Sequence, residues 1–280
     1  MPNEKLAITL SDNNQIKFTR PAVMGIVNCT PDSFTIHYSS QEEAISNARR
    51  IIEEGADILD LGGESSRPGS EPVSSEEELN RVIPVIENLR GFSNIPISID
   101  TTKAIVAGKA LTSGANIIND ISAFAFDADM PGIAKRFDCP VIMMHIKGIP
   151  KSMQDAPHYD DVINEVSIYF SERIDFAVAQ GIKREKLILD VGIGFGKRVE
   201  DNLKLIKYLK SFESFGLPLL LGASRKSFIG KITRAEVEDR VSGSLAVAAI
   251  AVNNGADIIR THDVAQTRQA VDMAFALREA

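Results

Sequence analysis

Polar side chains follow several short aliphatic segments of this sequence, and their types suggest ligand binding. One set combines carboxylates with an amide: Asp100, Asn119 and Asp190. A carboxylate accepts two parallel N–H bonds, while an amide both donates and accepts, so this set suits a flat heterocycle with several N–H donors in a row. Asp100 taken alone could equally cap the helix after it, and Asp60 and Asp120 are more simply read as partners of cations or helix caps.

A second set is basic and rich in hydroxyl groups, and it suits an anion. Its members are Ser66, Arg67, Ser224, Arg225, Lys226, Arg260 and His262. Phosphate sites in β/α barrels favour the loops after the last two strands. GASRKS (222–227) is no complete phosphate loop and GIGFGK (192–197) opens no dinucleotide-binding unit, so neither indicates a nucleotide site alone. His145 is as compatible with a supporting hydrogen bond as with catalysis.

Three related segments, which begin at Gly55, Gly114 and Gly255, indicate the elements that position these residues. Each reads Gly-Ala, then Asp or Asn, then two aliphatic residues. Glycine suits a helix end, and a short aliphatic run is typical of a parallel strand buried on both faces. Similar runs raise the number of expected strands to eight, at 23–28, 58–61, 95–100, 116–120, 139–145, 186–192, 217–223 and 257–261.

Segments with helical periodicity lie between these strands. Apolar residues recur at helical spacing in 76–89 and 160–180. Eight strands that alternate with helices predict an α/β fold, a (β/α)8 TIM barrel, with all of residues 1–280 in a single domain; an open doubly wound sheet is the second choice. Two alternating runs around a polar turn, within residues 6–20, predict an N-terminal β-hairpin that plugs the bottom of the barrel.

Composition limits the classes of function. The net charge of −7 argues against general nucleic-acid binding. The start of the chain lacks the pattern of a signal peptide and no apolar run is long enough to span a bilayer, so we expect a cytoplasmic protein without membrane association. Cys29 and Cys139 lack the spacing of a zinc site or a disulfide framework, and we expect both to be half-buried free thiols.

Eight motifs, in order along the chain, resemble the dihydropteroate synthase family. They are MGIVNCTPDSF, DLGGESSRPGSEPV, ISIDTTK, IINDISAF, MMHIKGIPKSMQ, LILDVGIGFGK, LLLGASRKSFIG and RTHDV, and they extend from Met24 to Val264. The resemblance implies transfer of the methylene of (7,8-dihydropterin-6-yl)methyl diphosphate to the amine of p-aminobenzoate, with release of diphosphate. It also implies use of Mg²⁺, a homodimer, and sulfonamides as inhibitors.

The same resemblance implies a role for each matching residue. The pterin pocket would comprise Asp100, Asn119, Asp190 and Lys226, with Met144 and Phe195 as apolar walls. Asn28 would contact the metal and the diphosphate, and Arg260 and His262 would bind the anion. Ser66, Arg67, Phe34 and Pro68 would belong to loops that close over p-aminobenzoate, whose carboxylate Ser227 would help to hold. Asp100, Lys226, Arg260 and His262 are the residues expected to take part in catalysis.

The first loop departs from the family pattern. Where the family continues with Ser-Asp-Gly-Gly after Phe34, this chain has Thr35 to Ser40 without glycine, which bears on p-aminobenzoate affinity and on the response to sulfonamides. Two alternatives remain open. A corrinoid-type pterin-binding methyltransferase would share the barrel and the acidic pocket but needs no SRK or RTHD anion site, and a catalytically silent pterin-binding homologue would bind without turnover.

Overall fold

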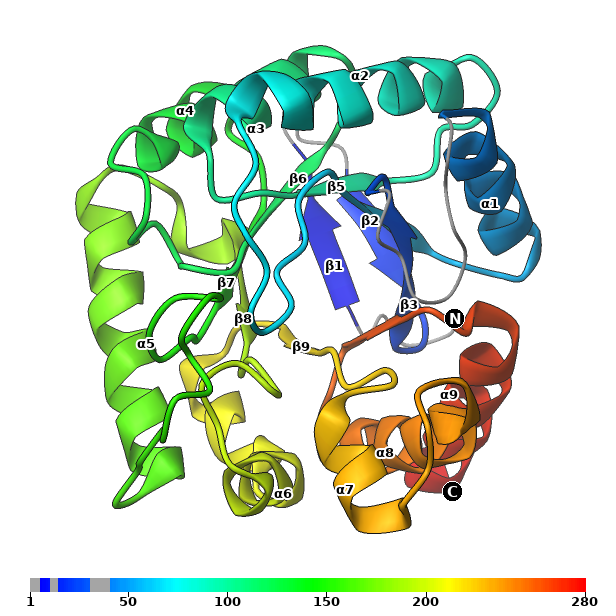
Figure 1. Cartoon of the computed structure of the whole chain (residues 1–280), viewed down its shortest axis with the longest axis vertical. Helices are drawn as coiled ribbons and strands as arrows, with labels where there is room; N and C mark the ends of the chain where they lie inside the picture. Colours follow the sequence, from blue (N-terminus) through cyan, green and yellow to red (C-terminus); the bar gives the residue numbers. More distant parts are fainter. Residues whose placement is uncertain (1–5, 11–14, 31–40) are drawn as a thin grey trace.

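A closed barrel of eight parallel strands forms the centre of the protein, as the computed structural model shows (Figure 1). The structure describes residues 6–10, 15–30 and 41–280. The barrel strands are β3 (Ala22–Asn28), β4 (Ile58–Gly62), β5 (Ile97–Asp100), β6 (Ile117–Asp120), β7 (Val141–Met144), β8 (Leu187–Asp190), β9 (Leu219–Leu221) and β10 (Ile258–Thr261). They follow one another in chain order around the barrel, and β10 closes it against β3. The predicted TIM barrel and its eight strands are confirmed.

Helices surround the barrel on its outer side. They are α1 (Gln41–Glu53), α2 (Ser75–Arg90), α3 (Ala104–Thr112), α4 (Met130–Phe137), α5 (Val162–Ala179), α6 (Val199–Lys207), α7 (Ser227–Thr233), α8 (Val241–Asn253) and α9 (Val264–Glu279). Short 3₁₀ turns occupy Arg184–Lys186, Leu209–Phe215 and Glu238–Arg240. All five apolar positions that the periodicity of α5 marked are buried: Val162, Val166, Phe170, Ile174 and Ala177. None of the helices within the described ranges is long and apolar enough to cross a membrane.

The Gly-Ala-Asp/Asn repeats bind the amino ends of neighbouring strands together. In each copy the glycine has a positive φ, and the acidic or amide side chain accepts the backbone N–H of a residue on the preceding strand. Asp57 accepts from Val23 at 2.8 Å, and Asn116 accepts from Ile97 at 3.0 Å. Asp257 repeats the contact with the N–H of Leu219 at 2.9 Å. A buried N–H left without a partner would be costly, which explains why the chain repeats this sequence.

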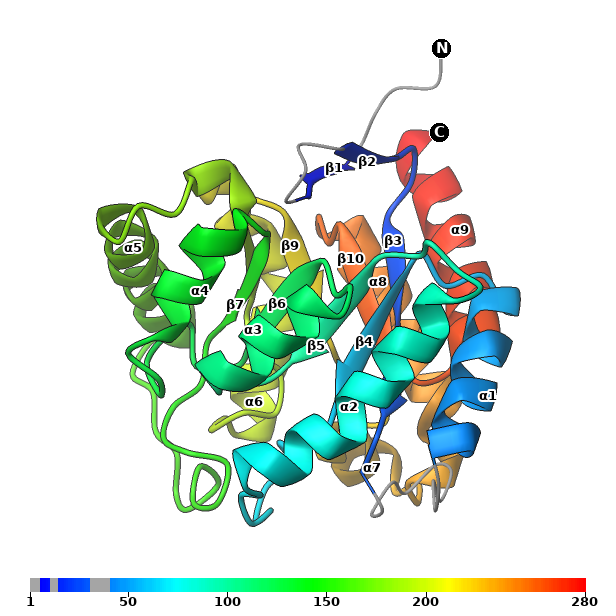
Figure 2. The ribbon, with the colours of Figure 1, turned by 90° about the horizontal axis from the view of Figure 1, so that it is seen from above.

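The barrel interior is divided into two layers by side chains at alternate strand positions. The lower layer is apolar and contains Met24, Ile58, Ile117, Ile142, Ile188, Leu220 and Ile258. The hairpin of β1 (Leu6–Thr9) and β2 (Gln15–Phe18) covers this end, where Leu6, Ile8 and Phe18 join the same apolar cluster (Figure 2). The expected plug is therefore confirmed. The upper layer lies two residues further along the strands and is polar. It contains Asp60, Asn119, Asp190 and Arg260.

The hairpin is expected to stabilise the barrel without affecting its opposite end. Ile8 is 3% exposed, so Ile8→Ala should lower the free energy of unfolding by about 2–4 kcal/mol through lost burial and the cavity left behind. Ile105→Ala makes the same change at a position 57% exposed on α3 and should have little effect. Denaturant titration measures both variants. Equal losses at the two positions would contradict the role of the hairpin as a plug.

Candidate active site

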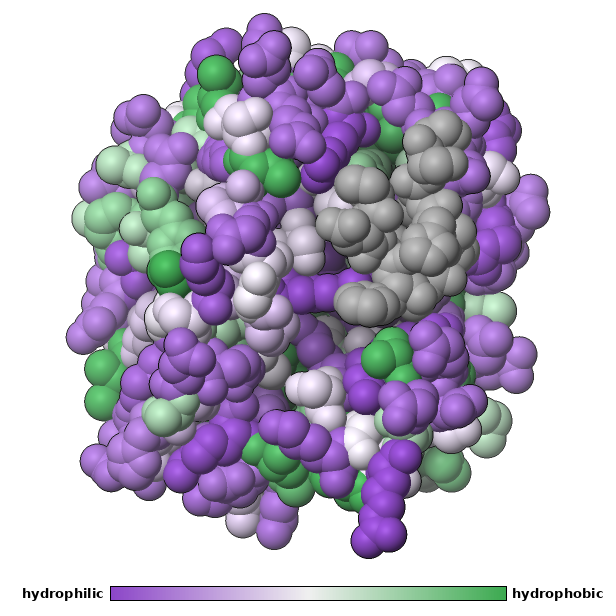
Figure 3. All heavy atoms as spheres, in the orientation of Figure 1, coloured by the Kyte–Doolittle hydropathy of each residue, from purple (hydrophilic) through white to green (hydrophobic). Residues whose placement is uncertain are grey.

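A cavity of about 320 Å³ opens at the carboxyl ends of the barrel strands, opposite the hairpin. Figure 3 shows this end of the molecule, where hydrophilic residues gather around the centre of the face. The expected site residues that line the cavity are Asn28, Ser66, Arg67, Pro68, Asp100, Phe195, Ser224, Arg225, Lys226, Ser227, Arg260 and His262. They come from six of the eight loops or strand ends, so the fold brings most of the predicted site together.

Three expected residues are buried at the same rim without lining the cavity: Asn119, Asp190 and Met144. The strand register pairs Asp100 with Asn119 and Met144 with Asp190, so the members of each pair lie side by side on neighbouring strands. Met144 packs in one apolar cluster with Phe195. The expected Phe34 lies outside the described residues, as does the unusual first loop from Thr35 to Ser40.

Arg260 is the centre of the polar layer. Its Nε donates to Oδ2 of Asp60 at 2.6 Å, and its Nη2 donates to Oδ2 of Asp100 at 2.8 Å. Asp60 also accepts from the amide of Asn119 at 3.1 Å. The helix after Asp100 has Lys103 as its cap residue, so the alternative of Asp100 as a helix cap is wrong. The simpler interpretation of Asp60 as the partner of a cation is confirmed. The cation is Arg260, which is itself an expected site residue.

Burial shifts the proton equilibria of these groups. It raises the pKa of Asp100 to about 7, against the opposing attraction of Arg260. It lowers the pKa of Lys226 to about 8, and the nearby charge of Arg260 acts in the same direction. Burial also disfavours the charged guanidinium of Arg260, but the two aspartates outweigh it and raise that pKa. Arg260 therefore stays a cation, while Asp100 and Lys226 can change charge near neutral pH.

His262 is held by the loop after β9. Its backbone N–H donates to the Ser224 hydroxyl at 3.2 Å, and its Nδ1 lies 3.0 Å from the same oxygen. Burial, together with the charge of Arg260, lowers the pKa of His262 to about 3, so the ring is neutral. A hydroxyl that accepts the backbone N–H has its own proton available for Nδ1, which leaves Nε2 to carry the ring proton as a donor.

Arg225 belongs to the expected basic set, but its guanidinium is already paired. Nε donates to Asp263 at 3.0 Å, and Nη2 donates to the other oxygen of the same carboxylate. Its backbone has φ 54° and its N–H donates to Ser244. Arg225 therefore connects the loops after β9 and β10 and also lines the cavity, and its expected role toward an anion stays a prediction.

Other supporting residues gave weaker signals in the sequence. Asp120 accepts from the backbone N–H groups of Ser122 and Phe124, so it fixes the turn after β6 instead of capping the next helix, which begins at Met130. His145 accepts from or donates to the amine of the buried Lys197 at 2.8 Å, which makes it a supporting group. Lys197 was not recognised in the sequence; a lysine that directly follows a glycine-rich loop was the available signal.

The comparisons with known proteins decide the family. Residues 24–262 match the family described as pterin-binding enzymes. Dihydropteroate synthase of Synechocystis is 46% identical over 261 residues, which cover 92% of this chain and 90% of that protein. The Escherichia coli K12 enzyme of the same name is also 46% identical, with 93% of each chain covered. This chain belongs to the dihydropteroate synthase family.

Solved structures of the family share the whole fold. The Yersinia pestis dihydropteroate synthase, in complex with a sulfonamide drug, has a TM-score of 0.94 at 41% identity and covers 98% of this chain and 100% of its own. The Xanthomonas albilineans dihydropteroate synthase with 4-aminobenzoic acid has a TM-score of 0.90 at 41% identity, with 99% and 100% covered. The resemblance that the motifs indicated is confirmed over nearly the full chain.

Asp60 is expected to support the site although it is fully buried. Asp60→Asn should lower kcat/KM roughly ten- to hundredfold, because hydrogen bonds between charged groups contribute about 1.5–3 kcal/mol and hold Arg260 in place. Asp57→Asn is the matched control, since Asp57 precedes the same strand and pairs with Arg268. Steady-state kinetics should show nearly normal constants for Asp57→Asn. A similar loss of kcat/KM in both variants would speak for a general structural defect.

Proposed function

We propose that the chain catalyses the dihydropteroate synthase reaction, in which (7,8-dihydropterin-6-yl)methyl diphosphate and p-aminobenzoate give 7,8-dihydropteroate and diphosphate. One observation carries this proposal: a single cavity combines acidic, cationic and hydroxyl groups at the rim of a barrel that matches this family along its length. We further propose a cytoplasmic location, which the free thiols of Cys29 and Cys139 support.

The pterin ring would occupy the acidic side of the cavity. Asp100 lines the cavity and offers carboxylate oxygens to ring N–H donors. We propose that Asp190 and Asn119, which are buried in the polar layer at the same rim, contribute hydrogen bonds as well. The ring of Phe195 forms an aromatic wall, and the Lys226 amine lies 4.0 Å from its centroid. A planar bicyclic ring between these groups would have apolar contact on its faces and hydrogen bonds along its edge.

The diphosphate would bind the basic side. Arg260 and His262 line the cavity and supply a fixed cation and a neutral N–H donor. We propose that Mg²⁺ binds here too, because Asn28 presents an amide oxygen and Mg²⁺ typically takes one or two protein ligands plus phosphate oxygens. The described residues contain no cluster of three or more His, Cys, Asp or Glu side chains that could hold a metal. When bound, Mg²⁺ would neutralise charge on the departing diphosphate.

The p-aminobenzoate subsite would lie at the outer side of the cavity. Ser66, Arg67 and Pro68 approach it from the loop after β4, and Ser227 approaches from the start of α7. Arg67 and Ser227 provide polar groups for the benzoate carboxylate, and we propose that Phe34 joins them. Sulfonamides would compete for the same place.

The chemistry would proceed by substitution at the methylene. The C–O bond to the diphosphate breaks first, and its electron pair leaves with an anion that Arg260 and His262 stabilise. The positive charge left on the methylene spreads into the pterin ring, where the carboxylates of Asp100 and Asp190 stabilise it more than the ground state. The arylamine nitrogen then attacks and loses its proton. Aniline nitrogens are weakly basic, so positioning does much of the work and no strong base is needed beforehand.

A turnover assay tests the function directly. The protein should form 7,8-dihydropteroate and diphosphate from the two substrates in the presence of Mg²⁺, and EDTA should abolish the reaction. Asp100→Asn should lower kcat by about 10²-fold, since it removes a charge aimed at the developing cation. Product formation is measured by chromatography and diphosphate by a coupled assay.

Other outcomes would identify the alternatives. Binding of the pterin in calorimetry without any turnover would indicate a silent homologue, and methyl transfer to a corrinoid without diphosphate release would indicate the methyltransferase. Full turnover by Asp100→Asn would refute the role given to that carboxylate. Turnover unaffected by EDTA would refute the proposed Mg²⁺.

We also propose a homodimer formed through α8 and α9, which pack side by side (Figure 1). Both helices expose large apolar side chains: Ile250 is 50% exposed, Met273 62% and Leu277 73%. Exposed apolar residues gathered on adjacent helices are typical of a protein interface. Along α8 only Ser244, Ala248, Ala251 and Val252 are buried, so part of its apolar surface is not covered by the barrel.

A charge placed on this surface should separate the subunits. Ile250→Glu should shift the molar mass in sedimentation or light scattering from dimer to monomer, because a buried carboxylate without a partner is costly at an interface. Ile168→Glu on α5 changes an isoleucine that is also 50% exposed and should leave the dimer intact. A dimer that persists in Ile250→Glu, or is lost equally in both, would refute this interface.

A further inference from the structure

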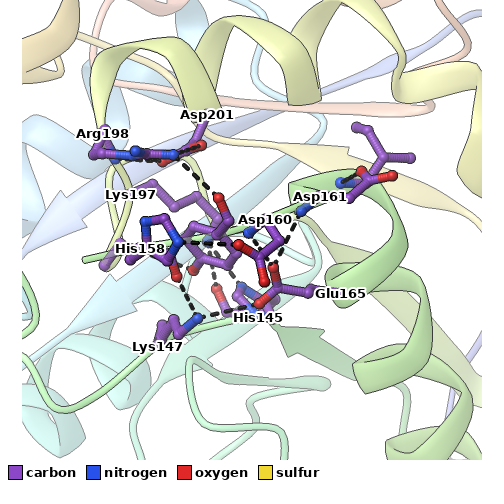
Figure 4. A network of polar contacts seen from close by, with 12 residues as sticks. His145, Lys147, His158, Asp160, Asp161, Glu165, Lys197, Arg198 and Asp201 are labelled. Carbon is purple, nitrogen blue, oxygen red and sulfur yellow. Dashed lines mark hydrogen bonds and ion pairs between the residues drawn. The ribbon is translucent and has the colours of Figure 1, made fainter.

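The loop between β8 and α6 folds around one buried amine. Lys197 is 3% exposed, and its Nζ lies 2.9 Å from the carbonyl oxygen of Gly192 and 3.0 Å from that of Phe195. Two further contacts reach the loop after β7: the carbonyl oxygen of His145 at 3.2 Å and its Nδ1 at 2.8 Å (Figure 4). Burial holds the pKa of His145 well below its usual value, so its neutral ring can accept a hydrogen bond from the amine at Nδ1.

Two glycines allow the backbone to approach this closely. Gly192 has φ 69°, and a Cβ there would lie 1.9 Å from the carbonyl oxygen of His145. Gly196 has φ 61°, and a Cβ there would lie 2.3 Å from the carbonyl oxygen of Lys147. The Tyr159 hydroxyl donates to the carbonyl of Gly196 at 2.8 Å. Residues 192–196 are thus held in one conformation by contacts with the loop after β7.

The same loop carries two groups of the proposed pterin subsite. The N–H of Gly192 donates to Oδ1 of Asp190 at 2.8 Å and fixes the orientation of that carboxylate. Phe195 lines the cavity between Lys226 and the apolar cluster that includes Met144. Lys197 itself does not line the cavity. Asp190 does not line the cavity either, so the effect of Lys197 on a ligand would act through Phe195, and through Asp190 as a buried member of the proposed subsite.

We propose that Lys197 is a positioning residue for the pterin. Its amine donates hydrogen bonds to the carbonyl oxygens of Gly192, Phe195 and His145. These bonds fix the loop and thereby the orientation of Asp190 and Phe195. This inference rests on the proposed function, since it takes the acidic side of the cavity as the pterin subsite. The side chain at position 197 therefore acts by donating hydrogen bonds to the loop and does not need to touch the substrate. No other described side chain donates a hydrogen bond to the carbonyls of Gly192 and Phe195.

Separate binding of the two halves of the substrate tests this role. Lys197→Met keeps the length of the side chain and removes its donors, so the Kd for 6-hydroxymethyl-7,8-dihydropterin should rise roughly ten- to hundredfold, as small displacements of positioning groups do. The Kd for inorganic diphosphate, which involves Arg260 and His262, should stay unchanged. A general structural defect would weaken both ligands. Lys204→Met, at an exposed position of α6, is the matched control and should bind both ligands normally.

A second variant keeps the test decisive if Lys197→Met does not fold. Lys197→Gln retains two N–H donors on a shorter side chain, so its pterin Kd should lie between those of wild type and Lys197→Met, with diphosphate binding unchanged. Normal pterin binding in either Lys197 variant, or equal loss of both ligands, would overturn the inference. Failure of the wild-type protein to bind the pterin would instead overturn the proposed function.

Discussion

The paired contacts of Arg260 with Asp60 and Asp100 hold the polar layer of the barrel together. Arg260 stands on β10, while its partners stand on β4 and β5, so the guanidinium reaches past β3. Buried ion pairs lose much of their attraction to desolvation, so this arrangement adds little to stability. The ion pairs instead fix the positions of the side chains. Removal of one member would leave a buried charge without a partner, so the other polar side chains of the layer would have to rearrange.

The apolar layer below makes these interactions strong. The hairpin and the isoleucines at the bottom of the barrel keep water away from one side of the polar groups, and Coulomb interactions strengthen as the local dielectric falls. The same burial moves the pKa values of Asp100 and Lys226 toward neutrality. An anionic ligand brought next to Lys226 and Arg260 would favour their charged forms, and a cationic centre next to Asp100 would favour its carboxylate. Substrate charges would thus shift these proton equilibria toward the charged forms.

The sequence predicted the strands, the hairpin and most residues of the cavity because these follow from local patterns. Short aliphatic runs mark buried parallel strands, and polar residues at their ends mark the rim. Pairings between distant strands have no such pattern. The contact of Asp60 with Arg260 spans 200 positions, and the commitment of Arg225 to Asp263 is visible only when two loops are seen together. The sequence also contained no sign that Asp57 accepts the backbone N–H of Val23, because this contact depends on which strand lies beside it.

Neighbouring loops supply the support that each cavity residue needs. Ser224, after β9, holds His262 after β10. Lys197 follows the same rule, since it connects the loop after β8 to His145 after β7. In a closed barrel every loop has a neighbour on each side, so such supports can form a ring without any open edge. A change in one loop therefore reaches the site through the next, even where the altered side chain never meets a ligand.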